Sequence, residues 1–169
     1  LNMLALVTFC LSTGMRRDEW TNTGDSSFMR RANFTWFKGK LEVHPNASGL
    51  ATLGDGDLLR VKSNPSKCDR DNLEWGAKDM WFRIDGANPL NFAAVYLEYE
   101  STYPCEPNER ATWAAFSPAG GPAPYAYSTA ASHLTTLMCA TIGAEEAKAR
   151  SWHAFRVTIA CALMARVGK

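Results

Sequence analysis

The sequence predicts a single, mainly helical α+β domain that contains a small antiparallel sheet. Four segments carry helix signals: residues 4–14, 89–103, 128–142 and the stretch from Ser151 onward. Two short segments, 58–63 and 80–84, instead alternate apolar and polar residues, as half-buried strands do. The chain has 169 residues, of which 46% are hydrophobic, so it is long and apolar enough for one buried core.

Particular residues mark the ends of the predicted helices. Gly14 follows the apolar run at residues 4–11 and suits a left-handed C-cap. Pro89 fits the first turn of the helix that follows it, and Gly143 closes the next helix. The apolar side of the helix after Pro89 carries Phe92, Val95, Tyr96 and Tyr99.

The strand at 58–63 separates its side chains between two faces. Arg60 and Lys62 share one face, and Leu59 and Val61 share the other. The remaining segments predict one strand or two short ones around a turn at 35–43, a turn at 53–57 and a loop at 117–124.

Charge does not by itself indicate a nucleic-acid partner. The net charge is only +1, so such a partner would have to meet local basic patches. Patches of this kind lie near both ends of the chain: Arg16, Arg17, Arg30, Arg31, Lys38 and Lys40 early, and Lys148, Arg150, Arg156, Arg166 and Lys169 late.

The five cysteines indicate an intracellular protein without a disulfide framework. Cys10, Cys139 and Cys161 lie in apolar helical segments, where buried free thiols are common. Cys68 and Cys105 lie in polar loops and form no C-x-x-C pair, so we expect no metal site. The apolar opening stretch is too short to span a membrane, and we expect no membrane partner.

The last helix opens with a histidine and an arginine. Ser151 can cap its amino end, and His153 and Arg156, three residues apart, project from one side of the opening turn. Free amides and the helix dipole favour an anion there. A phosphate suits this pair, because arginine offers a charged fork and histidine titrates near neutral pH. The competing interpretation is an ordinary surface pair on an amphipathic helix. The apolar face of that helix consists of Phe155, Ile159 and Leu163.

Two more motifs precede this one in the chain. Thr-Gly-Met-Arg-x-x-Glu spans residues 13–19, and the strand at 58–63 carries Lys62. In this order with His153-x-x-Arg156, the motifs resemble the tyrosine site-specific recombinases, the phage integrase family. The resemblance covers the chain from about Leu4 to its C-terminus. It implies a mainly helical α+β recombinase catalytic core whose small antiparallel sheet has three strands.

The resemblance also implies a role for each matching residue. Arg16 and Arg156 would grip the scissile phosphate of double-stranded DNA and stabilise the negative charge that builds on it during cleavage. Glu19 would fix the geometry of Arg16 or assist the histidine. His153 would transfer protons to and from the nucleophile, and Lys62 would protonate the leaving 5′ oxygen.

Lys67, in the loop after the strand, competes with Lys62 for the lysine position, and we favour Lys62 because of its strand context. The other residues expected to bind DNA are Arg17, Arg60, Lys67 and Arg70. None of these roles needs a metal ion or a nucleotide cofactor, and we expect neither.

The sequence departs from the family at the nucleophile. The family's tyrosine follows His-x-x-Arg, whereas all tyrosines here precede Arg156: Tyr96, Tyr99, Tyr103, Tyr125 and Tyr127. The family's amino-terminal DNA-clamping domain also has no counterpart. We therefore expect residues 1–169 to be a catalytic domain truncated at both ends and inactive alone. In the full-length protein, it would self-associate on DNA in the nucleus or nucleoid.

Three functions remain open. The first is DNA strand cleavage and rejoining through a phosphotyrosine, as in the recombination or integration of a mobile element. The second is a catalytically inactive relative that uses the same arginines only to hold DNA. The third is an unrelated helical domain with chance motifs. The sequence downstream of Lys169 would distinguish the first two.

Overall fold

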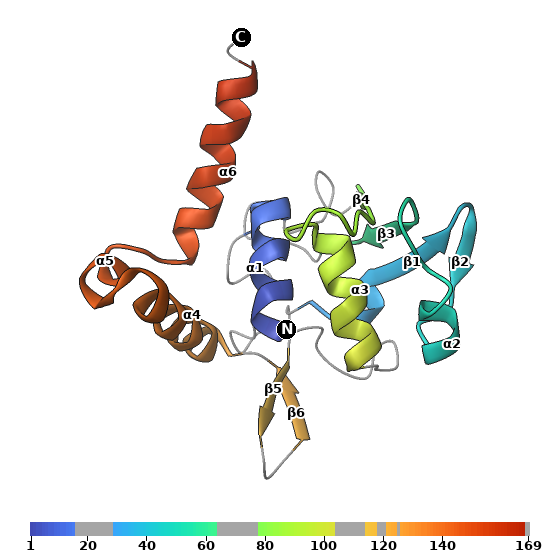
Figure 1. Ribbon diagram of the computed structural model, residues 1–169, viewed down its shortest axis with the longest axis horizontal. Coiled ribbons are helices and arrows are strands. Elements are labelled where there is room, and N and C mark those ends of the chain that lie inside the picture. Colours follow the sequence, from blue (N-terminus) through green and yellow to red (C-terminus); the bar gives the residue numbers. More distant parts are fainter. Residues whose placement is uncertain (16–28, 64–77, 104–113, 118–120, 125, 168–169) are drawn as a thin grey trace.

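A computed structural model describes residues 1–15, 29–63, 78–103, 114–117, 121–124 and 126–167 of the chain (Figure 1). The helices are α1 (Asn2–Thr13), the short 3-10 helix η2 (Arg31–Asn33), α2 (Ala47–Leu50), α3 (Phe92–Thr102), α4 (Tyr127–Ile142), α5 (Ala144–Lys148) and α6 (Trp152–Val167). The strands are β1 (Phe34–Lys38), β2 (Leu41–Val43), β3 (Leu58–Val61), β4 (Met80–Arg83), β5 (Ala114–Ser117) and β6 (Gly121–Pro124). The predicted α+β class is confirmed.

The main sheet has four antiparallel strands in the order β2-β1-β3-β4, where three were expected. The additional strand arises because residues 34–43 form a tight hairpin. Lys38 pairs with Leu41 across a two-residue turn in which Gly39 has φ 60°, a conformation that glycine adopts without strain. The alternative of two short strands around a turn is therefore the correct one for this segment.

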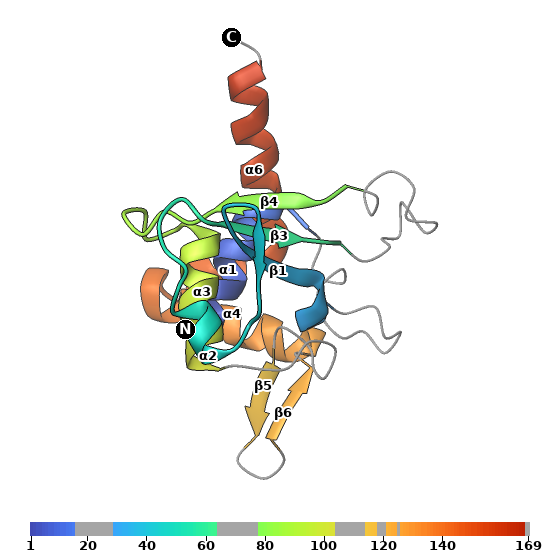
Figure 2. The same cartoon turned by 90° about the vertical axis from the view of Figure 1, so that its right-hand side faces the viewer.

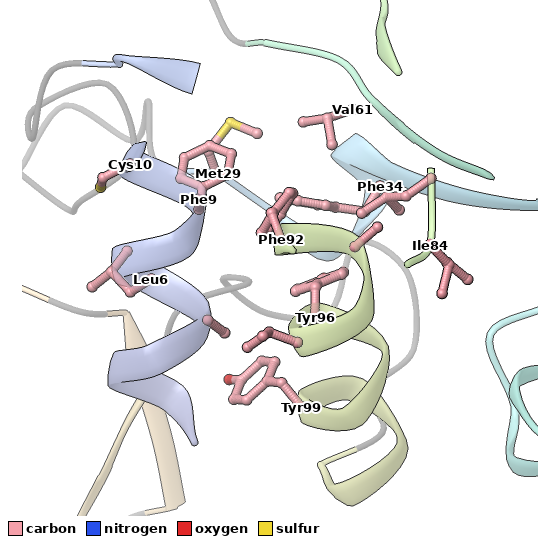
Figure 3. Packing of buried hydrophobic residues seen from close by; sticks show 14 of the residues in the cluster. Leu6, Phe9, Cys10, Met29, Phe34, Val61, Ile84, Phe92, Tyr96 and Tyr99 are labelled. Atoms are coloured by element: carbon pink, nitrogen blue, oxygen red, sulfur yellow. The ribbon is translucent and has the colours of Figure 1, made fainter. Parts of the chain in front are cut away.

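The core fills the space between one face of this sheet and the helices α1 and α3, which pack against each other (Figure 1). Aromatic rings make up much of the core, as Figure 3 shows. Phe9 of α1 lies 5.3 Å from Phe92 of α3 between ring centroids, and Phe34 of β1 lies 4.7 Å from Tyr96. Leu59 of β3 is fully buried, as the predicted alternation in that strand requires.

A buried ion pair joins the sheet to α3. Arg31 of η2 is 2% exposed and Glu100 of α3 is 1% exposed, and the guanidinium pairs with the carboxylate. The second carboxylate oxygen accepts a hydrogen bond of 2.6 Å from the indole N–H of Trp36. Arg31 also donates to the carbonyl of Phe34. The charges are thus paired and hydrogen-bonded, as burial demands.

The predicted start of α3 is wrong by three residues. Pro89 precedes the helix, and the N-cap is Asn91, whose side-chain oxygen accepts a 2.9 Å hydrogen bond from the backbone N–H of Ala94. An asparagine at this position satisfies one of the unpaired amides of the first turn, which a proline cannot do. The apolar side predicted for this helix is confirmed, since Phe92, Val95, Tyr96 and Tyr99 are all buried.

The segment predicted as a loop at 117–124 contains a strand. Residues Gly121–Pro124 form β6, which pairs antiparallel with β5 and places Pro124 opposite Ala114. Two prolines argue against a strand within a sheet, because proline removes a donor from the ladder. In a two-stranded hairpin each strand has a free edge, and there proline is tolerated.

The cysteines differ in exposure more than their helical contexts suggest. Cys10 in α1 is buried, Cys139 in α4 is half-buried and Cys161 in α6 is exposed. The expectation of a buried thiol is therefore wrong for Cys161. It lies on α6, whose carboxyl-terminal half extends away from the other elements in both Figure 1 and Figure 2.

We predict that Glu100→Gln lowers the free energy of unfolding by about 3–5 kcal/mol, because it leaves the buried Arg31 charge uncompensated. Urea unfolding followed by circular dichroism measures this. Glu98→Gln is the matched control, since Glu98 is exposed on the same helix and should change stability by less than about 0.5 kcal/mol. Equal stability of the two variants would contradict the structural role of the pair.

We predict that iodoacetamide at pH 8 modifies Cys161 but not Cys10 in the folded protein. Burial raises the pKa of the Cys10 thiol, so the reactive thiolate is scarce, and the sulfur is also shielded from the reagent. Mass spectrometry of the digested protein gives the extent of modification at each site. In guanidinium chloride both cysteines should react, and equal rates in the native state would contradict the packing of α1.

Candidate nucleic-acid interface

The Thr-Gly-Met part of the first motif forms the end of α1. Gly14 has φ 65° in the left-handed region, and its N–H donates to the carbonyl of Cys10 at 3.0 Å, as predicted for a C-cap. The hydroxyl of Thr13 donates to the carbonyl of Phe9 at 2.9 Å and accepts a 3.3 Å hydrogen bond from the N–H of Met15. These contacts fix the direction in which the chain leaves α1.

The amino end of α6 is held by its first two residues. The hydroxyl of Ser151 accepts a 3.3 Å hydrogen bond from the N–H of His153, which confirms the predicted N-cap. Trp152 is 7% exposed, and its indole N–H donates to the carbonyl of Ala130 in α4 at 3.1 Å. A buried indole with a satisfied donor anchors the first turn of α6 on α4.

His153 and Arg156 therefore extend from an anchored turn. His153 is exposed and Arg156 is half-buried. Within the described part of the chain, the guanidinium of Arg156 forms no ion pair, and so its charge is not neutralised by a neighbouring carboxylate. This end of α6 combines an available cation with the helix amides that bind anions. The side chains of Phe155, Ile159 and Leu163, the predicted apolar face, lie outside the description.

The start of the first motif and the start of the last lie at the ends of helices that pack together. α6 contacts α1, and both Figure 1 and Figure 2 show it leaving the body of the domain beside α1. Met15 and Arg156 are more than 140 residues apart in sequence by their numbering, so only the tertiary fold brings these helices together. The described start of the first motif, Thr13 to Met15, thus lies at the end of a helix that packs against the helix of the last motif.

Lys62 lies directly after β3, exposed to solvent, on the face of the sheet opposite the core. Two hydrogen bonds with Asn33 hold the backbone of Lys62, one at its N–H and one at its carbonyl. The N–H of Lys62 donates to the carbonyl of Asn33 at 2.8 Å, and the side-chain amide of Asn33 donates to the carbonyl of Lys62 at 3.0 Å. The lysine side chain therefore starts from a held point of the backbone and is exposed to solvent.

Arg60, expected to bind DNA, already has partners within the sheet. Its guanidinium donates to the hydroxyl of Thr35 at 3.1 Å and lies 5.3 Å from the ring centroid of Phe37. One guanidinium nitrogen is 3.8 Å from a carboxylate oxygen of Asp79. Asp79 compensates part of the arginine charge, so Arg60 attracts phosphate less than an unpaired arginine would.

The remaining site residues lie outside the described part of the chain: Arg16, Arg17, Glu19, Lys67 and Arg70. The assignment of the lysine position to Lys62 rather than Lys67 therefore stays a prediction. So does the convergence of Arg16 with Arg156 on one phosphate.

Two contributors to this region were not identified from the sequence. Asn33 acts on Lys62 across 29 residues, and no periodic pattern reports such a contact. Trp152 adjoins the His-Arg motif, and an aromatic residue directly after an N-cap serine could have indicated an anchor for the helix. Asn33 positions Lys62, and Trp152 positions the turn that carries His153. We assign neither of them a contact with phosphate.

The described residues contain no group of three histidine, cysteine, aspartate or glutamate side chains that could hold a metal ion. Within the same residues, no helix has the length and hydrophobicity needed to cross a membrane. Comparisons with protein-family models, with curated proteins and with solved structures found no match to this chain.

Proposed function

We propose that this chain is the catalytic core of a tyrosine site-specific recombinase, which cleaves and rejoins DNA strands through a phosphotyrosine. The observation that supports the proposal most is the packing of α1 against α6. It brings the helix that ends at Thr13, before Gly14 and Met15, next to the helix that begins at Trp152, directly after Ser151. The next residue after Met15 is Arg16, the arginine of the first motif.

The proposed binding step uses arginines and helix amides. Arg156, on the anchored first turns of α6, would hold two oxygens of the scissile phosphate together with Arg16. Guanidinium groups stay charged at any working pH and match the geometry of two phosphate oxygens. As negative charge builds on those oxygens in the transition state, fixed cations stabilise it without rearranging.

The proposed proton transfers use His153 and Lys62. His153 is exposed and can meet an incoming hydroxyl, from which it would accept a proton as the tyrosine oxygen bonds to phosphorus. As the bond from phosphorus to the 5′ oxygen breaks, Lys62 would give that oxygen a proton. Glu19 would support Arg16 or the histidine. The motif assigns the attacking tyrosine to a position after Arg156, so we assign the nucleophile to none of the five tyrosines in this sequence.

The alternative is a relative that binds DNA without cleaving it. It would use Arg16 and Arg156 in the same way but form no covalent intermediate. We expect both the recombinase and the non-catalytic relative to self-associate on DNA. Val157 and Met164, which are 45% and 75% exposed on α6, provide apolar surface that association could cover.

We predict that Arg156→Ala weakens binding to duplex DNA about equally for different sequences. The slope of log K against log salt concentration should fall by about 1, because one phosphate contact is lost. Fluorescence anisotropy with labelled duplexes at several salt concentrations measures both quantities.

Arg150→Ala is the matched control for this measurement. Arg150 is a nearby exposed arginine that pairs with Glu146. Its removal should leave the salt slope nearly unchanged. If Arg156→Ala and Arg150→Ala behave alike, Arg156 does not contact the phosphate.

We also predict that the 169-residue chain forms no covalent adduct with a suicide DNA substrate, whereas the protein translated from the whole gene does. Denaturing gel electrophoresis detects the adduct. In the whole protein, His153→Gln and Lys62→Ala should each slow adduct formation by about 10²- to 10⁴-fold, the usual contribution of a proton-transfer group.

His133→Gln and Lys40→Ala, which change exposed residues elsewhere on the domain, serve as controls for the adduct assay. DNA binding without an adduct from the whole protein would favour the non-catalytic relative. An adduct from the 169-residue chain that is lost with Tyr125→Phe or Tyr127→Phe would show that the nucleophile precedes Arg156.

A further inference from the structure

The face of the main sheet that points away from the core carries aromatic side chains. Strand register places Thr35, Arg60 and Trp81 side by side on this face, and Phe37, Leu58 and Arg83 in the next row. We call these six residues the outer face of the sheet. An antiparallel sheet that is solvated on one side normally has polar residues there, so its two aromatic rings require an explanation.

The two rings form a preorganised group. Phe37 and Trp81 lie 5.3 Å apart between centroids at an interplanar angle of 51°, and the guanidinium of Arg60 lies 5.3 Å from the Phe37 centroid. The rings are supported by contact with each other and with a cation. Trp81 is nevertheless 50% exposed, whereas Trp36 on the core face of β1 is fully buried. About half of the surface of Trp81 is therefore accessible to a ligand.

Cations flank these rings. Arg83 is exposed in the same row as Phe37, and Lys62 follows Arg60 on the same face, just beyond the end of β3. Two carboxylates share the face. Asp79 is paired with Arg60, and Glu42 lies opposite Phe37 on the edge strand β2. Lys62 and Arg83 have no ion-pair partner among the described residues, so the exposed charge close to Trp81 is positive.

We propose that the outer face binds single-stranded DNA, with bases stacked on Trp81 and Phe37 and phosphates beside Lys62 and Arg83. Exposed aromatic rings with flanking cations are the combination that single-stranded nucleic acids bind, because every base has a face to stack and every nucleotide carries a negative charge. Paired bases in a duplex are already stacked on each other, and so the rings select unpaired strands.

Stacking on these rings would not require recombinase activity, but the choice of DNA rather than RNA rests on the proposed function. The six residues of the outer face have no role at the phosphate site of α6, although Lys62 beside them is assigned to the proposed proton transfer there. Figure 2 looks onto the domain from the side of the sheet, and α1 and α6 lie behind it. Substitutions at Trp81 and at Arg156 therefore separate the two surfaces.

The test is fluorescence anisotropy of the 169-residue chain with three labelled 15-nucleotide probes: oligo(dT), an abasic strand of the same length and oligo(rU). Trp81→Ala should weaken oligo(dT) binding by about 5- to 150-fold, the effect of removing one stacked base. Trp81→Phe should restore most of the affinity, since a ring remains. Binding of the abasic strand should not change, which also shows that the variant keeps its fold.

Leu41→Ala is the matched control, because Leu41 is an apolar residue of the same sheet, 76% exposed, that points to the opposite face. It should leave oligo(dT) affinity unchanged. Wild-type affinity of Trp81→Ala for oligo(dT) would overturn the proposal, as would an equal loss for the abasic strand. Tighter binding of oligo(rU) than of oligo(dT) would overturn the assignment to DNA.

Anisotropy measurements of both Trp81→Ala and Arg156→Ala, with oligo(dT) and with duplex DNA, distinguish the two proposals. If Arg156→Ala leaves duplex binding intact while Trp81→Ala still weakens oligo(dT) binding, the phosphate site fails and the outer face stands. If only duplex binding responds, and only to Arg156→Ala, the outer face fails and another partner, such as a protein, would have to account for its exposed rings.

Discussion

The structure depends on the buried pair between Arg31 and Glu100. It joins η2, at the start of the sheet, to the last turns of α3, and Trp36 in β1 completes it with a hydrogen bond to the same carboxylate. Such a pair adds little net stability, because desolvation offsets the attraction between the charges. We expect its main effect to be on specificity, since an arrangement that separated Arg31 from Glu100 would leave a charge buried without a partner. The pair therefore favours the observed packing of the aromatic core.

That arrangement fixes α1, and α1 in turn relates the core to the candidate interface. Phe9 packs on Phe34 and Phe92 in the core, and the carboxyl-terminal end of the same helix precedes the arginine motif in the sequence. α6 packs against the same helix and is anchored through the indole of Trp152. The described part of the proposed site combines an anchored helix start with an exposed His153 and a half-buried Arg156. The two proposed surfaces belong to this one framework and share Lys62, directly after β3.

Where a local rule was decisive, the sequence predicted the structure well. Gly14 and Ser151 cap the helices that they were expected to cap, and Leu59 and Val61 are buried as the period of two requires. The failures occurred where two local rules competed. At Pro89, the preference of proline for a first turn was weaker than the side-chain cap offered by Asn91. In β6, which pairs with β5 alone among the described strands, two prolines are acceptable because the other edge is free of a described partner.

The sequence by itself determined the α+β class, the helix caps Gly14 and Ser151 and the faces of β3, because caps and periodicity depend only on neighbours in the chain. It also supplied the motifs from which His153, Arg156 and Lys62 were chosen. Only the tertiary structure decided that α6 lies beside α1, that Asn33 holds Lys62, and that Phe37 and Trp81 meet on the outer face. Each of these is a contact between segments far apart in sequence. Such contacts follow from how the core packs, which no local pattern encodes.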